Sequence, residues 1–395
     1  MTAPYFDIAD PTFSVQSDQV RDAREAGWYA ETSYGLAILR YDEVSRLMKD
    51  RRLRQGSAAW PAHNGVTDGP FAHWFASWIL NKEGEDHRRL RRLLNPAFSP
   101  KLLASLVPRL QALANELVDG FFDAGHCEFV GAFGEPYAAR VIAIMLGIPE
   151  EEWPRIARLS TTIGLSLGVT IKEDLPKIEE ALAGLYEYGD ELIAARRADP
   201  RDDFVTRLVQ AQREDDKLSN DELRDTLALL VFGGYDTTRN QLSLALQTFL
   251  RNPDQWRVLG ERPELGGAAV EEVMRVNPTV TWVTREALED FTFQDLEIAA
   301  GTTIHLFSES AGTDPRAVPD GFDITAERPP HFGFGGGAHH CLGHFVARSD
   351  MSEALPLLAR RLLEPRIDGE AGWLPLSGNT GATRLPISFD RGSRR

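Results

Sequence analysis

The 395-residue sequence predicts a mainly α-helical fold with small β-sheets. Three observations support this fold class. Apolar residues recur at intervals of three and four over most of the chain after residue 85. One helical pattern, between residues 219 and 250, is long enough to cross a whole domain, and the strand-like runs are short and few. Strands do not alternate regularly with helices, so we expect no βαβ units.

The first helical patterns lie between residues 86 and 197. A helix is predicted over residues 86–94, and Ser99-Pro100 begins a second helix whose apolar stripe continues to Phe121. Two more helices are predicted over about residues 135–146 and 177–197. An acidic loop over residues 199–203 follows them.

The longest helix is predicted from Ser219 to Leu250. Ser219 and Glu222 have the spacing of a capping box, and apolar residues continue from there at helical intervals. Pro253 prevents the helix from continuing much further. The segment lacks coiled-coil heptads, so we expect it to be the central helix of a large helical domain.

The strand patterns are runs of β-branched or aromatic residues bounded by Gly, Pro or Asp. Four such strands are predicted, over residues 35–40, 280–285, 291–293 and 302–307. Runs this short predict small sheets at the side of the helical domain.

The composition restricts the class of partner. The 43 Lys and Arg residues and 59 Asp and Glu residues give a net charge of −16, which argues against binding nucleic acid or an anionic membrane. Two cysteines, Cys127 and Cys341, are typical of a protein in a reducing cytoplasm. Residues 1–11 lack the pattern of a signal peptide, and no window approaches the roughly 20 apolar residues of a membrane-spanning helix. We expect a cytoplasmic protein.

The strongest chemical signal is the segment Phe334-Gly335-Gly336-Gly337-Ala338-His339-His340-Cys341-Leu342-Gly343. Its glycines allow the backbone to approach a flat ligand closely, and the apolar run after Cys341 predicts a helix that begins there. A cysteine at a helix N-terminus has a depressed pKa, so we expect a thiolate that can bind a metal.

Two other interpretations of this segment remain open. Cys341 can be a buried cysteine in a glycine-rich turn, or it can bind zinc together with His339, His340 and His344. Structural zinc sites usually contain at least two cysteines at short spacing, whereas the only other cysteine is Cys127.

The segment resembles the haem loop of the cytochrome P-450 superfamily, Phe-x-x-Gly-x-(His/Arg)-x-Cys-x-Gly. Phe334, Gly337, His339, Cys341 and Gly343 occupy the fixed positions. The resemblance implies haem b as cofactor, with Cys341 as the axial ligand of the iron, Phe334 beside the sulfur and His339 on a propionate. It also implies that Gly335 lies against the haem.

A second resemblance lies on the long helix, where Gly233-Gly234-Tyr235-Asp236-Thr237-Thr238 is similar to the family's (Ala/Gly)-Gly-x-(Asp/Glu)-Thr-Thr. Two glycines inside a helix cost about 1 kcal/mol each relative to alanine, and threonine hydroxyls there can bond back to the carbonyl four residues earlier. By itself the segment indicates a tolerated kink. Together with the cysteine loop it implies oxygen activation, with Asp236 delivering protons and Thr237 holding the oxygen intermediate.

Further resemblances concern charged residues. Glu272-x-x-Arg275 matches the family's Glu-x-x-Arg, in which residues three apart share a helix face. In the family a further arginine, which usually follows a Phe-Asp-Ile-like run, completes this charged cluster. Here Ala326 occupies the expected position of that arginine, and Arg328 is two positions beyond it. By the same resemblance His87, Arg91 and Arg285 bind haem propionates. A solvated helix face is the other interpretation of the His87-x-x-x-Arg91 pair.

The resemblance implies a single triangular domain over residues 1–395, with about 1–30 and 391–395 at its periphery and the haem between the long central helix and the cysteine loop. It implies a monomeric monooxygenase. The chain shows no flavin or iron–sulfur module, so electrons are expected from NAD(P)H through an external ferredoxin and reductase. The basic run at residues 87–92, with Arg88 and Arg92, could steer that ferredoxin.

The predicted substrate is a hydrophobic or aromatic small molecule, either a natural product or a xenobiotic. We expect its pocket to be lined by Trp60, Phe75, Trp78, Val231, Gly233, Gly234, Trp282 and Asn379, with the turn Ser377-Gly378-Asn379-Thr380 facing the cavity. His63, His73 and Asn379 could anchor a polar group, although aromatic residues of this kind are more often core. Two alternatives remain: a peroxygenase or oxidative coupling or rearrangement enzyme, and a non-catalytic haem sensor or carrier.

Overall fold

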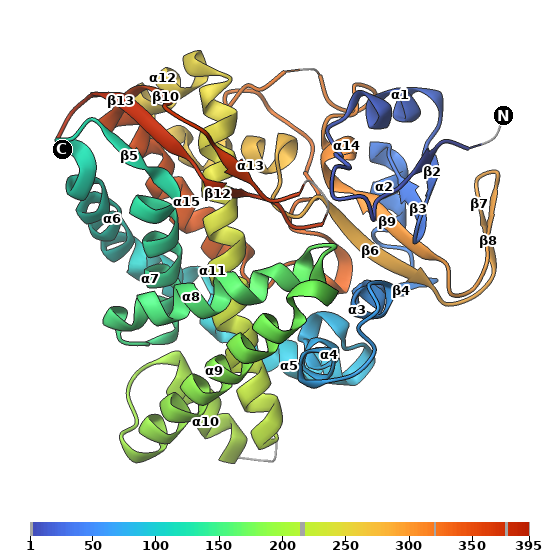
Figure 1. Ribbon diagram of the computed structural model, residues 1–395, viewed down its shortest axis with the longest axis horizontal. Helices are drawn as coiled ribbons and strands as arrows, with labels where there is room; N and C mark the ends of the chain where they lie inside the picture. Colours follow the sequence, from blue (N-terminus) through green and yellow to red (C-terminus); the bar gives the residue numbers. More distant parts are fainter. Residues whose placement is uncertain (1–2, 214–217, 320, 376–377, 395) are drawn as a thin grey trace.

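A computed structural model describes residues 3–213, 218–319, 321–375 and 378–394 of the chain. Most of these residues are helical, as Figure 1 shows. The α-helices are α1 (Asp18–Ala26), α2 (Tyr41–Leu47), α3 (Trp60–His63), α4 (Pro70–Ser77), α5 (Gly84–Leu94), α6 (Pro100–Phe122), α7 (Glu135–Leu146), α8 (Trp153–Gly164), α9 (Ile171–Ala198), α10 (Phe204–Arg213), α11 (Asn220–Leu250), α12 (Pro253–Glu261), α13 (Gly266–Val276), α14 (Ser308–Gly312) and α15 (His344–Arg361). None of the helices in these ranges is both long and apolar enough to cross a membrane.

The strands form one larger sheet and three small ones. The larger sheet has the order β1 (Tyr5–Phe6), β2 (Tyr29–Thr32), β3 (Gly35–Ile38), β9 (Thr303–Phe307), β6 (Trp282–Ala287), β4 (Leu53–Gln55). Its β1–β2 and β3–β9 pairs are parallel and its other pairs antiparallel. The small sheets are β10 (Leu362–Ile367), β13 (Pro386–Arg391) and β5 (His126–Glu128); β11 (Gly372–Trp373) and β12 (Ala382–Arg384); and β7 (Phe291–Phe293) and β8 (Leu296–Ile298).

Helix α11 passes through the middle of the molecule, with the larger sheet to one side of the helical part (Figure 1). Its N-terminus is fixed by the predicted capping box: the Ser219 hydroxyl accepts from the Glu222 amide at 3.0 Å, and the Ser219 amide donates to the Glu222 carboxylate at 2.9 Å. Helices α7, α8 and α9 pack against it. The predicted central helix is therefore confirmed, with its start one residue after Ser219.

Most other predicted elements are also confirmed, with shifted ends. Helix α9 begins at Ile171, six residues before the predicted start. The Ile171 side chain is fully buried, so tertiary packing extends the helix N-terminally past Pro176. Strands β1, β2, β4, β5, β8 and β10 to β13 were not predicted, because runs of two to six residues are defined by their pairing partners more than by a local pattern.

The N-terminal segment packs against the larger sheet. Phe6, Ile8 and Phe13 are buried together with Trp282 of β6 and Phe307 of β9. The first 30 residues, expected at the periphery, thus contribute to a separate hydrophobic cluster. Trp282 also lines the central cavity described below, so this cluster supports one of its walls.

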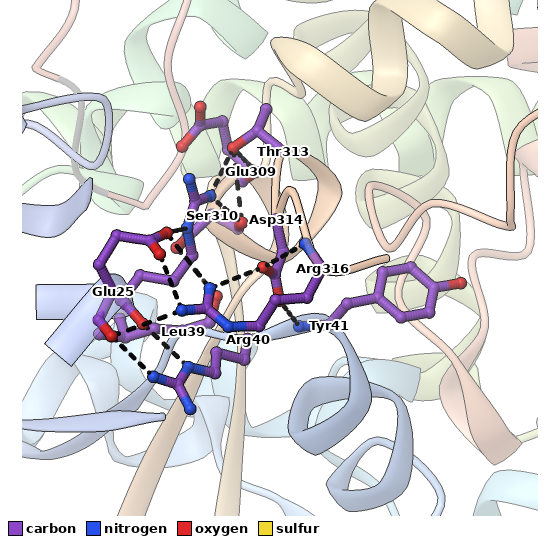
Figure 2. Close-up of polar contacts among 10 residues, drawn as sticks. Glu25, Leu39, Arg40, Tyr41, Glu309, Ser310, Thr313, Asp314 and Arg316 are labelled. Atoms are coloured by element: carbon purple, nitrogen blue, oxygen red, sulfur yellow. Dashed lines mark hydrogen bonds and ion pairs between the residues drawn. The ribbon is translucent and has the colours of Figure 1, made fainter. Parts of the chain in front are cut away.

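A polar cluster fixes the N-terminal segment to the residues that follow α14 (Figure 2). Arg40 donates to the Glu25 carbonyl at 3.0 Å, and the Glu25 carboxylate pairs with Arg316 at 2.8 Å. Asp314 accepts from Arg316 at 3.1 Å and from the Tyr41 amide at 3.0 Å. Asp314 therefore caps the N-terminus of α2 and connects it to the segment after α14.

Asp350, on α15, is a fully buried carboxyl whose two oxygens have no hydrogen-bond partner among the described residues. Burial raises the pKa of Asp350 well above its usual value, and the nearby Met351 amide offsets this only partly. The carboxyl is therefore protonated in the folded protein over a pH range in which the unfolded chain is ionised. The folded state then binds more protons, so the contribution of Asp350 to stability is lost as pH rises above the unfolded pKa.

We expect Asp350→Asn to remove this pH dependence. Near pH 4 the variant and the unsubstituted protein should have similar free energies of unfolding. Above pH 4 the variant should become more stable than the unsubstituted protein by about 1.4 kcal/mol per pH unit, up to the pKa of Asp350 in the folded protein. Urea unfolding followed by tryptophan fluorescence between pH 4 and 8 measures the difference. Asp22→Asn, at an exposed aspartate of α1, is the control for loss of a carboxyl that the fold does not bury. Parallel pH profiles for Asp350→Asn and the unsubstituted protein would contradict the prediction.

Candidate active site

A cavity of about 450 Å³ lies between α11 and the loop that carries Cys341. Cys341 and Phe334 contribute to its wall from the loop, and Gly233, Asp236 and Thr237 contribute from α11. Much of the remaining wall is apolar or aromatic, from α4, α7, the segment after α13 and α15. The volume is within the range of ligand pockets. The two strongest sequence motifs, about 100 residues apart, therefore line the same cavity.

The backbone of the loop turns sharply before Cys341. Gly335 and Gly337 have φ values of 65° and 72°, a left-handed conformation that side chains disfavour. A Cβ atom on Gly336 would lie 2.7 Å from Cγ of Met48, so this glycine is required by close packing. The Cys341 amide donates to the Phe334 carbonyl at 3.0 Å, and α15 begins at His344 as predicted.

The electrostatic surroundings of Cys341 differ from the prediction. Burial raises the pKa of the Cys341 thiol, and the Gly343 amide, Arg91 and Arg348 lower it only in part. The prediction of a depressed pKa in the protein chain alone is therefore wrong, because desolvation of the charged sulfur outweighs the helix N-terminus. A thiolate at this position needs a cation bound to it.

The zinc interpretation of this loop finds no support. Over the ranges that the structure describes, no three His, Cys, Asp or Glu side chains are grouped so that they could hold a metal ion. The His344 imidazole contacts the Cys341 carbonyl at 2.7 Å, and His340 packs edge-on against His344.

Phe334 is held in place beside the cavity. The guanidinium of Arg348 lies over its ring at 4.6 Å from the centroid, and Arg348 pairs with Glu271 at 2.5 Å. Glu271 is on α13 and Arg348 on α15, so the ion pair connects the two helices that flank the loop. The contact with Arg348 was not predicted, because none of the sequence motifs indicates a cation–π pair at this position.

The two glycines of α11 have different surroundings. A Cβ atom on Gly233 would meet nothing within 4 Å, because this position faces the cavity. A Cβ atom on Gly234 would lie 2.5 Å from Cδ1 of Ile142, so Gly234 allows α7 to pack closely. The Thr237 hydroxyl donates to the Gly233 carbonyl at 2.9 Å, which is the predicted bond to the carbonyl four residues earlier.

Asp236 is a buried carboxyl with several polar partners. Its oxygens accept from the Asn379 amide at 2.6 Å, from the Asn240 amide at 3.2 Å and from the Arg239 guanidinium at 3.4 Å. Burial raises the pKa of Asp236, while Arg239 and the Asn379 amide oppose that rise. Arg239 also reaches Glu135 of α7 at 3.4 Å, and Glu135 is partly exposed. A polar connection therefore runs from Asp236 toward the surface.

The predicted propionate contacts differ in their relation to the cavity. His87 and Arg91 line it, and neither side chain has a hydrogen-bond partner among the described residues. His339 also lines it, with its ring tilted against that of His87 at a centroid distance of 4.2 Å, and it contacts Glu83 at 3.2 Å. Burial lowers the pKa of His87 to about 4. Arg91 and His87 thus present unused donors to the cavity.

Arg285 is not among the cavity-lining residues. Its guanidinium is buried and donates to Gln55, to the Gly336 carbonyl at 3.1 Å and to Met48. Burial lowers the pKa of Arg285 to about 10. Gln55 itself lines the cavity, so Arg285 lies directly behind the wall.

Glu272 and Arg275 form a buried ion pair. Two guanidinium nitrogens of Arg275 contact the Glu272 carboxylate at 2.6 and 2.7 Å, and both side chains are 3% exposed. Arg275 also donates to the Gly312 and Gly321 carbonyls at 2.8 and 2.7 Å. Arg328 lies 3.3 Å from Glu272, although it is displaced by two positions from the family pattern.

Most of the predicted substrate contacts line the cavity, but Val231 does not. The predicted residues on its wall are Trp60, Phe75, Trp78, Gly233, Gly234, Trp282 and Asn379. Val231 is 1% exposed and belongs to the helical core, so this prediction is wrong. On α11 the positions that face the cavity include Leu230, Gly233 and Thr237. Val231 follows Leu230, and one residue turns the helix by about 100° away from the cavity.

The other two predicted polar anchors, His63 and His73, lie in different places. His63 lines the cavity, whereas His73 pairs with Asp68 at 3.1 Å on the surface. Ser377, which belongs to the turn predicted to face the cavity, lies outside the described residues. The apolar wall that α7 contributes through Val141, Ile142 and Met145 was missed, because the sequence of α7 is apolar on all sides.

A flat ligand fits this site. The cavity has a cysteine sulfur on its wall, an open groove at Gly233 and unused cationic or imidazole donors at Arg91 and His87. A thiolate site for haem iron with donors for two propionates has this combination of groups. The fold and the cavity together define the class of haem-thiolate proteins.

Comparisons with known proteins agree with that class. The cytochrome P-450 family model matches residues 156–261 and 264–363. Luteothin monooxygenase of Streptomyces thioluteus is 37% identical over 391 residues, which cover 98% of this chain and 96% of the relative. Mycinamicin IV hydroxylase/epoxidase of Micromonospora griseorubida is 34% identical over 330 residues, covering 82% and 81%. The crystal structure of CalO2 superimposes with a TM-score of 0.87 at 26% identity, covering 98% of this chain and all of the other.

The chain belongs to the cytochrome P-450 family, and its fold is the fold of that family. Family membership implies haem as cofactor, O₂ as co-substrate and a redox partner. The names of the two relatives describe a monooxygenase and a hydroxylase/epoxidase, and this chain is likewise an oxygenase.

Proposed function

We propose that this enzyme inserts one oxygen atom from O₂ into a hydrophobic or aromatic natural product, and that the sulfur of Cys341 would hold the haem iron. The observation that carries the proposal is that Cys341, Asp236 and Thr237 line the same cavity. Haem with a thiolate ligand supplies electron density that favours cleavage of the O–O bond. The protein chain must add protons, substrate orientation and exclusion of water.

Proton delivery is assigned to Asp236 and Thr237. The carboxyl of Asp236 is 2% exposed, and its raised pKa favours the protonated form that a general acid requires. Thr237 follows it on the cavity side of α11, where its hydroxyl can receive and pass on a proton. The Arg239–Glu135 contact connects Asp236 with the partly exposed side of α7 and supports resupply of protons from solvent.

Binding of the haem propionates is assigned to His87, Arg91 and His339. Arg91 and His87 have unused donors toward the cavity, which supports this role. Arg285 is assigned a supporting role behind Gln55, since its donors are occupied by Gln55, Met48 and Gly336.

Electrons are proposed to come from NAD(P)H through a ferredoxin reductase and a ferredoxin. Arg88 and Arg92 are exposed, which supports contact with an acidic partner. Each of them already pairs with Glu85 at 3.0 Å, so the positive charge of this helix face is partly neutralised. Both cysteines are unpaired, which supports a reducing compartment such as the cytoplasm.

The substrate class is proposed from the cavity wall and the relatives. Trp60, Phe75, Trp78 and Trp282 supply aromatic surface, which favours an apolar or aromatic substrate. The names of the relatives indicate luteothin and mycinamicin IV as their substrates. Luteothin is therefore the first probe to test on this chain.

The proposed function is tested with ¹⁸O₂. The purified haem-loaded enzyme is incubated with luteothin, NADPH, a ferredoxin and its reductase, and products are examined by mass spectrometry. We expect one ¹⁸O atom in the product. Thr237→Ala should keep the haem but lower the fraction of electrons recovered in product by about tenfold or more, with the difference released as hydrogen peroxide.

Thr238→Val is the matched control, since it removes the neighbouring hydroxyl on the same helix. It should retain most of the coupling between NADPH oxidation and product. Full coupling in Thr237→Ala would overturn the role of Thr237. Product without ¹⁸O would overturn O₂ insertion, and equal turnover with hydrogen peroxide alone would favour a peroxygenase instead.

A further inference from the structure

The Asn379 side chain connects Asp236 to the loop that lines the substrate cavity. Its amide nitrogen donates to the Asp236 carboxylate at 2.6 Å, and its carbonyl oxygen lies 2.9 Å from the Thr279 hydroxyl, whose hydrogen it shares with the Thr380 carbonyl at 2.7 Å. Asn379 was expected to contact substrate directly. In the structure both ends of its amide have protein partners, although the residue still lines the cavity.

Asp236 is enclosed by three parts of the chain. On α11 it is contacted by Arg239 and Asn240. On α8, a Cβ atom at Gly164 would lie 2.9 Å from a carboxylate oxygen of Asp236, so this helix closes the second side. Asn379 closes the third side and is the one contact that comes from a loop of the cavity wall.

Two cavity-lining segments are joined around Asn379. Residues 279–281 and 378–380 pair through an antiparallel bridge between Val280 and Asn379. The Thr281 amide donates to the Gly378 carbonyl and the Thr380 amide to the Thr279 carbonyl, both at 2.8 Å. A molecule that packs against this bridge therefore presses on the backbone that carries Asn379.

The charges that face Asp236 determine what the loss of Asn379 would do. On α11 the cation that faces Asp236 is Arg239, and Tyr235 is the residue before Asp236. Glu135 of α7 contacts Arg239 and so influences Asp236 indirectly. From α8 the facing groups are Gly164 and the neutral Thr161. Asn379 is thus the only neutral donor outside α11 that bonds Asp236 among the described residues, and it favours the ionised carboxyl.

We propose that Asn379 is a positioning residue for Asp236, which fixes the orientation of this carboxyl and couples it to substrate packed against residues 279–281 and 378–380. The inference rests on the proton-delivery role of Asp236 in the proposed function. Asn379 does not touch the reacting atoms; it acts through the hydrogen bond to Asp236. A substrate that shifts the bridge changes this bond and so changes how readily Asp236 gives up its proton.

The test is an infrared titration of the buried carboxyl in the haem-loaded protein. The C=O stretch of protonated Asp236 is identified as the band that disappears in Asp236→Asn. In Asn379→Ala the pH midpoint of this band should rise by about one to two units, because a hydrogen bond to the charged form is lost. Val280→Ala is the matched control: it removes a similar volume from the same bridge, keeps the hydrogen bond and should leave the midpoint unchanged.

A swapped pair provides a second variant that keeps the bond. Asn379→Asp alone places a second carboxyl beside Asp236 and should raise the midpoint further. The double variant Asn379→Asp with Asp236→Asn exchanges acid and amide, and it should restore a single carboxyl whose midpoint lies nearer that of the unsubstituted protein. An unchanged midpoint in both Asn379→Ala and Asn379→Asp would overturn the inference.

Coupling with luteothin separates this inference from the proposed function. If Asp236→Asn leaves coupling unchanged, the role of Asp236 fails, whatever the infrared result at Asn379. If Asp236→Asn diverts electrons to peroxide but Asn379→Ala changes neither the midpoint nor the peroxide fraction, the role of Asn379 alone fails. We expect Asn379→Ala to change both the pH midpoint and the peroxide fraction, and the peroxide fraction should be larger when luteothin is bound.

Discussion

Replacing Cys341 with histidine is expected to abolish the strongly red-shifted Soret band of the reduced, carbon monoxide-bound enzyme. The band requires a thiolate bound to the haem iron, and among the described residues Cys341 is the only cysteine on the cavity wall. An imidazole ligand donates less electron density, so oxygenase activity should fall by more than the roughly 10–100-fold typical of changes around a metal ligand. The measurement is the difference spectrum of the reduced protein with and without carbon monoxide.

Cys127→Ser is the control for this experiment. Cys127 lies on β5, away from the cavity lining, and burial raises its pKa to about 12, so it is no thiolate near neutral pH. The control should keep the red-shifted band. A normal histidine-like Soret in the unsubstituted protein, or a red-shifted band that survives in Cys341→His, would exclude Cys341 as the ligand and reopen the interpretation of the loop as a structural turn.

Replacing Arg275 with alanine is expected to lower the free energy of unfolding by about 3–5 kcal/mol, because it leaves the Glu272 carboxylate buried without its main partner. Arg275 also donates to the carbonyls of Gly312, the last residue of α14, and of Gly321, so α14 and the segment before the cysteine loop lose their connection to α13. We expect poor recovery of haem-loaded protein as a consequence. Urea unfolding followed by tryptophan fluorescence gives the change in stability.

Arg328→Ala is the graded comparison. Arg328 contacts the Glu272 carboxylate through one nitrogen at 3.3 Å and donates to the Pro319 and Gly321 carbonyls at 3.0 and 3.4 Å. Its loss should cost less than the loss of Arg275, because Arg275 contacts the same carboxylate through two nitrogens at 2.6 and 2.7 Å. Arg275→Lys keeps the charge but loses the two-pronged contact and should fall between them. Equal stability of Arg275→Ala and the unsubstituted protein would show that the buried pair contributes nothing to the fold.

The sequence was sufficient where a local pattern has one physical solution. The capping box at Ser219 and Glu222 satisfies amide donors that any helix start exposes, and the structure has both of its bonds. The glycines before Cys341 and the adjacent Gly233 and Gly234 indicated backbone that something approaches closely. The family resemblance then ordered these motifs, and the comparisons support the resulting fold and enzyme class.

The sequence was not sufficient where distant segments decide the environment of a residue. The pKa of Cys341 rises because burial outweighs the helix N-terminus, and burial is set by elements far along the chain. Val231 faces the core instead of the cavity because the phase of α11 is fixed by the helices that pack on it.

The sequence by itself determined the fold class, the central helix and the residues at which haem chemistry was to be expected. Only the tertiary structure brought Arg328 to Glu272, 56 residues away, and Asn379 to Asp236, 143 residues away. The physical reason is that such contacts depend on how whole elements pack, since the 2.6 Å hydrogen bond between Asn379 in its loop and Asp236 on α11 leaves no pattern in either local sequence.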